Sequence, residues 1–90
     1  MNHIVKRKGH AEQYDARKLY ASIYAACLSV RATEGEAELV AERVVKDVEA
    51  WLAKKHEVTS SDIRRMASRH LKAYHADAEY MYWHHRELHR

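Results

Sequence analysis

Residues 4–19 read IVKRKGHAEQYDARKL, and this stretch sets the fold expected for the rest of the chain. Residues 4–7 and 11–14 have the length of two short strands, and Gly9 between them tolerates the positive φ of a tight turn. Asp15 offers a carboxylate to the first N–H groups of a following helix, so it is predicted as an N-cap. The stretch therefore predicts a β-hairpin that leads directly into a helix.

The same stretch is strongly basic, with five Lys and Arg residues among sixteen. Cations on a hairpin that ends at a helix N-terminus favour an anion, because the first N–H groups of the helix add partial positive charge. We therefore expect a localised anion site at this end of the molecule. The net charge of the whole chain is only +3, which does not indicate a protein that coats nucleic acid.

Helical patterns fill the remaining sequence. The first helix is predicted over residues 16–29, with Leu19, Ile23 and Cys27 on its buried stripe. Thr33 and Glu36 have the spacing of a capping box, which opens a second helix with apolar positions from residue 37 to residue 52. Thr59 or Ser60 caps a third helix. Because neither Gly nor Pro interrupts residues 61–88, the pattern alone predicts one continuous helix there.

Length and composition restrict the class of protein. Ninety residues predict one domain over 1–90, and 47% hydrophobic with 32% charged residues predict a globular, mostly helical chain. Cys27 is the only cysteine, which excludes an internal disulfide and a Cys-rich zinc site. No apolar run has membrane-spanning length and no signal peptide is visible, so we expect a cytoplasmic protein without a membrane partner.

Two motifs resemble the ATP-cone, the nucleotide-binding regulatory domain of ribonucleotide reductases and of a bacterial repressor of their genes. The first motif combines Val5, Lys6-Arg7, Gly9, Glu12, Tyr14-Asp15 and Lys18-Leu19, and the second is VTSSDIR at residues 58–64. The resemblance implies a mainly α (α+β) fold, in which four helices are capped by a small three-stranded sheet with an N-terminal hairpin. It also implies a third strand near residue 58 and a helix break near residues 75–77, with Asp77 as a candidate cap.

The resemblance further implies ATP or dATP as ligand, with Mg²⁺ as a candidate companion of the phosphates. The implied ligand residues are Val5, Lys6, Arg7, Glu12, Asp15, Lys18, Ser60 and Arg64, to which His84 or Arg86 is added. In relatives the basic pair serves the phosphates, and carboxylates at the positions of Glu12 and Asp15 face the adenine edge. These two acids have an alternative role, pairing with cations and capping the helix. Near the end of the last helix Trp83-His84 replaces a common Tyr-Arg pair, so that contact passes to His84 or Arg86.

The resulting prediction is an allosteric sensor of adenine nucleotide and not an enzyme, since the sequence has no P-loop and no apparatus for in-line attack. Because the sequence ends with the cone, we expect a free-standing domain that acts in trans, by self-association or on a ribonucleotide reductase subunit or transcription factor. Two alternatives stay open, a nucleic-acid-binding protein that uses residues 59–72 and a degenerate cone that serves as an interaction module. His85 and His89 are four apart on a helix but lack a third ligand, so no metal site is predicted.

Overall fold

The computed structural model describes residues 4–7 and 10–88, without the side chains of Ile4, Arg7, His10, Glu12 and residues 85–88. Its elements, in chain order, are β1 (Ile4–Arg7), β2 (His10–Gln13), α1 (Ala16–Ser29), α2 (Glu34–Leu52), β3 (Val58–Thr59), α3 (Ser60–Tyr74) and α4 (Ala76–Leu88). The predicted mainly helical class is confirmed. The second strand lies one residue earlier than predicted, and Tyr14 and Asp15 connect it to α1.

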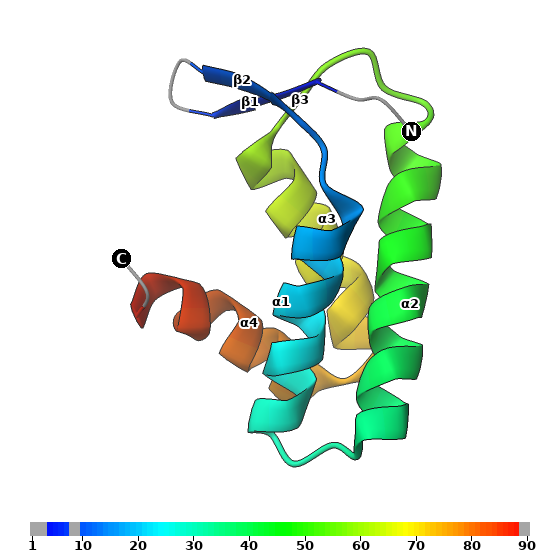
Figure 1. The fold of residues 1–90 in the computed structure, drawn as a ribbon, viewed down its shortest axis with the longest axis vertical. Coiled ribbons are helices and arrows are strands. Elements are labelled where there is room, and N and C mark those ends of the chain that lie inside the picture. The colour runs from blue at the N-terminus through cyan, green and yellow to red at the C-terminus, as the bar shows by residue number, and fades with distance from the viewer. Residues whose placement is uncertain (1–3, 8–9, 89–90) are drawn as a thin grey trace.

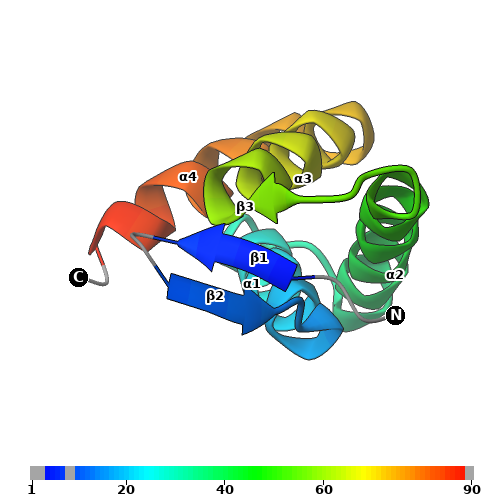
Figure 2. The same cartoon turned by 90° about the horizontal axis from the view of Figure 1, so that it is seen from above.

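A small sheet with the strand order β2-β1-β3 lies across one end of the helices (Figure 1 and Figure 2). β1 pairs antiparallel with β2, where Val5 is opposite Glu12, and parallel with β3, where Val5 is next to Val58. Val5 and Val58 are buried, so one face of the sheet closes the end of the core. Since α1 follows β2 and α3 follows β3, both helices begin at the sheet, on either side of the central strand.

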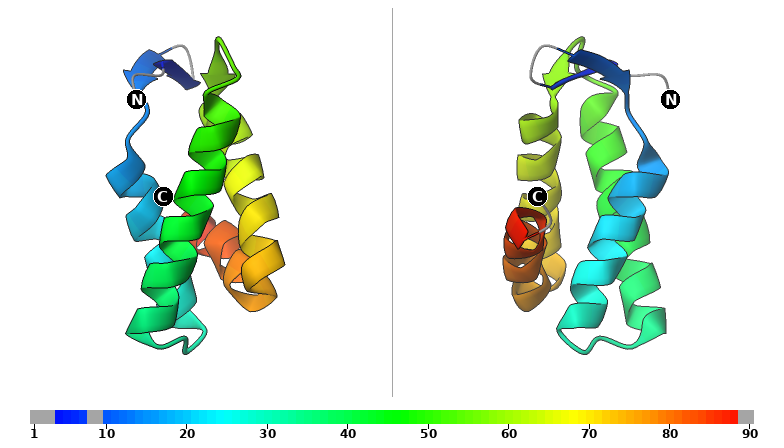
Figure 3. Two further views of the ribbon diagram at one scale, coloured as in Figure 1. Left: turned by 90° about the vertical axis from the view of Figure 1, so that its right-hand side faces the viewer. Right: turned by 60° about the vertical axis from the view of Figure 1, so that its left-hand side comes forward.

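The hydrophobic core lies between α1, α2 and α3, which run side by side, and α4 packs against α1 and α3 (Figure 1 and Figure 3). The predicted stripes supply it, since Leu19, Ile23, Ala37, Val44 and Leu71 are buried. Cys27 is buried as predicted, and burial raises the pKa of its thiol. Among the described residues, no helix has both the length and the apolar character needed to cross a membrane.

The single helix predicted over residues 61–88 is wrong, because α3 ends at Tyr74 and α4 begins at Ala76. His75 has extended backbone angles, φ −161° and ψ 97°, which interrupt the helix where the family resemblance implied a break. Asp77 lies in the first turn of α4 and is not its cap. Instead, Nδ1 of His75 accepts a hydrogen bond from the Ala78 N–H at 3.4 Å. The break turns α4 back onto α1 and α3, where Ala78 and Tyr82 are buried.

Candidate functional site

The central strand β1 brings the basic motif between two helix N-termini. β1 pairs with β3, which continues directly into α3, and with β2, which reaches α1 through only two residues. In the pairing register Lys6 lies beside Thr59, the N-cap of α3. The first turns of α1 and α3 therefore meet the sheet at the same end of the molecule (Figure 1). Helix N-termini favour anions, which makes this end the candidate site.

Val5 and Lys6 differ in exposure, as expected for neighbours on a strand. Val5 is buried in the core, whereas Lys6 is exposed and its Nζ donates a hydrogen bond to Oε2 of Glu57 at 2.6 Å. This hydrogen bond, together with the charge of Glu57, raises the pKa of Lys6. Any anion that binds Lys6 must compete with Glu57 for its ammonium group. The side chain of the next basic residue, Arg7, lies outside the described part of the chain.

Asp15 caps α1, which is the structural role that the sequence predicted for it. Its Oδ1 accepts hydrogen bonds from the backbone N–H groups of Arg17 at 3.0 Å and Lys18 at 3.4 Å, so it caps α1. Lys18 is exposed in the first turn, where a cation is unfavourable to the helix dipole unless an anion compensates. The neighbouring Tyr14, in the link between β2 and α1, packs against the core. The side chain of Glu12, the second predicted acid, is not among those described.

α3 begins with a capping box. The Thr59 hydroxyl accepts from the Asp62 N–H at 3.0 Å, and an Asp62 carboxylate oxygen accepts from the Thr59 N–H at 3.0 Å. The backbone hydrogen bond from Thr59 is the main cause that lowers the pKa of Asp62. Ser60, the first residue of α3, and Arg64, four residues later, are half-buried. The structure thus holds the predicted pair Ser60 and Arg64 at the sheet end of α3.

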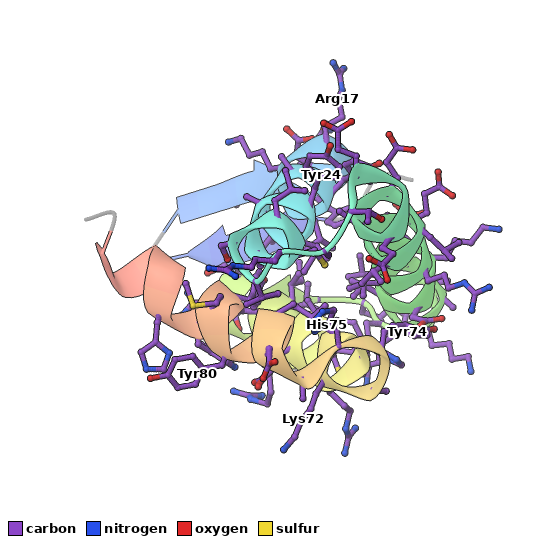
Figure 4. The ribbon with its side chains drawn as sticks, turned by 90° about the horizontal axis from the view of Figure 1, so that it is seen from below. Arg17, Tyr24, Lys72, Tyr74, His75 and Tyr80 are labelled. Carbon is purple, nitrogen blue, oxygen red and sulfur yellow. The ribbon has the colours of Figure 1, made fainter. Side chains whose placement is uncertain are left out.

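Near the end of α4, Trp83 is a side chain that contacts Arg64. The Arg64 guanidinium lies over the Trp83 ring, with 5.5 Å between Cζ and the ring centroid. His84 instead stacks on Tyr80, with 3.9 Å between ring centroids, and its Nδ1 contacts the Tyr80 carbonyl oxygen at 2.8 Å. Tyr80 points away from the bundle in Figure 4, so its stacking partner His84 lies on the outer side of α4. The side chain of Arg86, which was predicted together with His84 as a nucleotide contact, is outside the description.

A polar chain next to Arg64 was not predicted. Nε1 of Trp83 donates to Oγ of Ser68, and the Ser68 hydroxyl donates to Oε2 of Glu79 at 2.6 Å. Ser68 is the one polar residue among the buried residues that the structure describes. The spacing of four residues from Arg64 to Ser68, and from Glu79 to Trp83, places each pair on one face of its helix, but it does not show that the two faces meet.

The alternative nucleic-acid surface is only partly assembled. Arg65, Arg69 and Lys72 are exposed along α3, and Lys72 points outward in Figure 4. Arg64 does not share that surface, because it lies over Trp83, and Arg65 contacts Asp62 at 3.3 Å. No group of three metal-ligating side chains occurs in the part of the chain described here. His85 and His89, considered as metal ligands, lie outside the described side chains.

Comparison with known proteins gives one informative match. A family model described as the ATP cone domain matches residues 2–90. Domains of this family are regulatory and non-catalytic, and they bind ATP or dATP as effectors. No curated protein and no solved structure matches the chain. Because the family match covers almost every residue, and includes both motifs at the sheet end of the molecule, the chain belongs to the ATP cone domain family.

Proposed function

We propose that this protein senses ATP or dATP through a site at the sheet end of the molecule, bounded by β1 and the first turns of α1 and α3. The observation that carries the proposal is that the elements which meet at this end each carry a basic residue: Lys6 lies on β1 beside the N-cap of α3, Lys18 in the first turn of α1, and Arg64 near the start of α3. Guanidinium and ammonium groups from separate elements suit a triphosphate, which carries several charged oxygens. The donor set therefore fits a nucleotide.

The proposed roles follow the chemistry of each side chain. The phosphates are bound by Lys6, Arg7 and Arg64, and Mg²⁺ accompanies the phosphates as their counter-ion. Lys18 binds the ribose or a phosphate. Glu12 accepts from the adenine 6-amino group, and it is better suited than Asp15 because the latter already caps α1. Val5 and Ser60 border the site from the sheet and from α3. His84 or Arg86 supplies the last contact if α4 turns that face toward the ligand.

The proposed output is a shift between two conformational populations. A nucleotide that contacts β1, α1 and α3 together stabilises the arrangement in which these elements are close, and this changes the surface available for assembly. We propose self-association or a protein partner as the target, a ribonucleotide reductase subunit or a transcription factor in the cytoplasm, acting in trans. This part of the proposal is supported by the family alone and by no contact in the structure.

ATP and dATP are expected to stabilise the protein against heat. A ligand that binds only the folded state at 100 times its Kd adds about 2.7 kcal/mol, which raises the Tm of a domain of this size by roughly 10 °C or more. The measurement is a thermal melt with millimolar nucleotide and magnesium, with magnesium alone as control. An unchanged Tm with every adenine nucleotide tested would leave the degenerate interaction module as the better interpretation.

The substitution Glu12→Gln is expected to reduce discrimination between ATP and GTP by roughly tenfold or more, about 1.4 kcal/mol. A carboxylate accepts from the adenine amino group but repels the O6 acceptor of guanine, whereas an amide serves either base. Calorimetric titration with both nucleotides measures the ratio of the two Kd values. Glu12→Gln/Gln13→Glu is a control, because it moves the charge to the neighbouring position of β2. Equal selectivity in wild type and Glu12→Gln would remove Glu12 from the base-reading role.

A further inference from the structure

We propose that Trp83 is a positioning residue for the nucleotide phosphates, because its ring holds the Arg64 guanidinium at the site while Ser68 and Glu79 hold the ring. This inference rests on the proposed function above. It assigns a role in binding to a residue of α4 that has no charge of its own. Trp83 contacts Arg64 of α3, whereas its neighbour His84 stacks on Tyr80 within α4.

The contact between Arg64 and Trp83 joins two helices that approach each other after the break at His75. The guanidinium Cζ is 5.5 Å from the ring centroid, within the range over which the face of an indole attracts a cation. Both side chains are half-buried, so water competes less than at a fully exposed site. A planar guanidinium on a fixed ring keeps its N–H groups in a defined direction, which is what bidentate phosphate binding requires.

The ring itself is fixed by hydrogen bonds that have only one consistent direction. The indole N–H is only a donor, so the Ser68 oxygen must accept from it. The single proton of the Ser68 hydroxyl is then given to Oε2 of Glu79, at 2.6 Å. Because Ser68 is only 5% exposed, water does not readily replace either bond. Glu79 thus orients Ser68, Ser68 orients Trp83, and Trp83 supports Arg64.

A packing role and a positioning role predict different ligand responses. If Trp83 only fills space, its loss lowers stability and affects every ligand of the site to a similar degree. If it positions Arg64, its loss weakens ATP binding but leaves binding of adenosine, which has no phosphate, unchanged. The effect on ATP must also vanish when Arg64 is already absent, since the two residues then act as one unit.

The experiment titrates ATP and adenosine into wild type, Trp83→Leu, Trp83→Phe, Arg64→Ala and the double variant Arg64→Ala/Trp83→Leu. We expect Trp83→Leu to raise the Kd for ATP by about threefold to tenfold, with adenosine unchanged. Trp83→Phe retains an aromatic face and recovers part of the loss. The double variant binds ATP as weakly as Arg64→Ala alone. If Trp83→Leu does not fold, Trp83→Phe and Ser68→Ala are compared in the same way, with a smaller loss of ATP affinity expected in both.

Tryptophan fluorescence provides a second measurement. The chain has two tryptophans, so Trp51→Phe leaves Trp83 as the sole emitter. ATP is expected to change its emission, and Arg64→Ala is expected to remove that change. Equal losses for ATP and adenosine in Trp83→Leu, or a further loss of ATP in the double variant, would overturn the positioning role. If wild type binds ATP and Arg64→Ala weakens this binding, but the Trp83 variants leave it unchanged, then only this inference fails. If wild type does not bind ATP, the proposed function fails with it.

Discussion

Leu71→Ala is expected to lower the free energy of unfolding by about 2–5 kcal/mol. Leu71 lies near the C-terminal end of α3, is fully buried, and belongs to the core shared with α1 and α2. Removing its side chain loses the transfer free energy of the buried atoms and leaves a cavity that the surrounding helices only partly close. For a domain of this size such a loss is a large share of the total stability, which is about 5–15 kcal/mol in most proteins. Urea denaturation followed by circular dichroism measures it.

Leu39→Ala is the matched control, because it makes the same substitution inside a helix. Leu39 lies in α2 and is 50% exposed, so its truncation is expected to change the free energy of unfolding by no more than about 0.5 kcal/mol. Both variants replace leucine by alanine, so helix propensity changes equally in the two. Similar midpoints for the two variants would contradict the core described above. If Leu71→Ala is unfolded without denaturant, Leu71→Met keeps most of the volume and tests the same site.

The helical part of the fold could be predicted because its signals are local. Leu19 and Ile23 repeat at helical spacing, and Thr33 with Glu36 forms the predicted capping box. Such signals depend on residues within one or two turns of each other, so they are visible in a linear sequence. The predicted cap Asp15 is of the same kind, since its hydrogen bonds reach only two and three residues along the chain.

The break at His75 could not be predicted from local pattern, since the surrounding residues all tolerate a helix. Its cause is tertiary. An unbroken helix over residues 61–88 would be about 42 Å long, whereas the longest extent of the molecule is 35 Å. Part of that helix would project from the bundle, and Ala78 and Tyr82 would lose the core that buries them. The break allows α4 to pack on α1 and α3, and only the family resemblance indicated it.

The candidate site shows the same division between local and tertiary signals. Lys6 and Arg64 were identifiable because each belongs to a short motif with a recognisable spacing. The partners of these residues were not identifiable, since Glu57 and Trp83 are distant in sequence and approach them only in the fold. Ser68 illustrates the limit, because a serine on a helix gives no sign in the sequence that it will be buried between a tryptophan and a glutamate.

Removal of both hairpin cations, in Lys6→Ala/Arg7→Ala, is expected to cause the largest loss of ATP affinity. Hydrogen bonds to charged groups contribute about 1.5–3 kcal/mol, so each single substitution weakens ATP by roughly 10-fold to 150-fold. The double variant loses more than either single variant, although neighbouring positions need not add. Calorimetric titration of the three variants with ATP gives these losses, and their circular dichroism spectra show whether the fold is intact.

Glu57→Gln is expected to change ATP affinity in the opposite direction, and it therefore separates phosphate binding from a general loss of charge. In the structure Glu57 holds the Lys6 ammonium at 2.6 Å and places a carboxylate beside the proposed phosphates. Removing that charge frees Lys6 and is expected to strengthen ATP binding by up to about fivefold, the range of an exposed ion pair. Lys6→Ala/Glu57→Gln should show little of this gain, because the lysine that Glu57 competes for is absent.

The hairpin variants, together with variants of the exposed cations of α3, distinguish the nucleotide sensor from a protein that binds nucleic acid. A duplex would be held by the exposed cations of α3, so Arg65→Ala, Arg69→Ala and Lys72→Ala would weaken it most, and binding would fall steeply with salt. Those three substitutions are expected to leave ATP binding close to wild type. A DNA titration at two salt concentrations, run beside the ATP titrations, makes the comparison direct. Wild-type ATP affinity in both Lys6→Ala and Arg7→Ala would contradict the proposed site. Strong DNA binding that depends on Arg69 and Lys72 would instead support the nucleic-acid surface of α3.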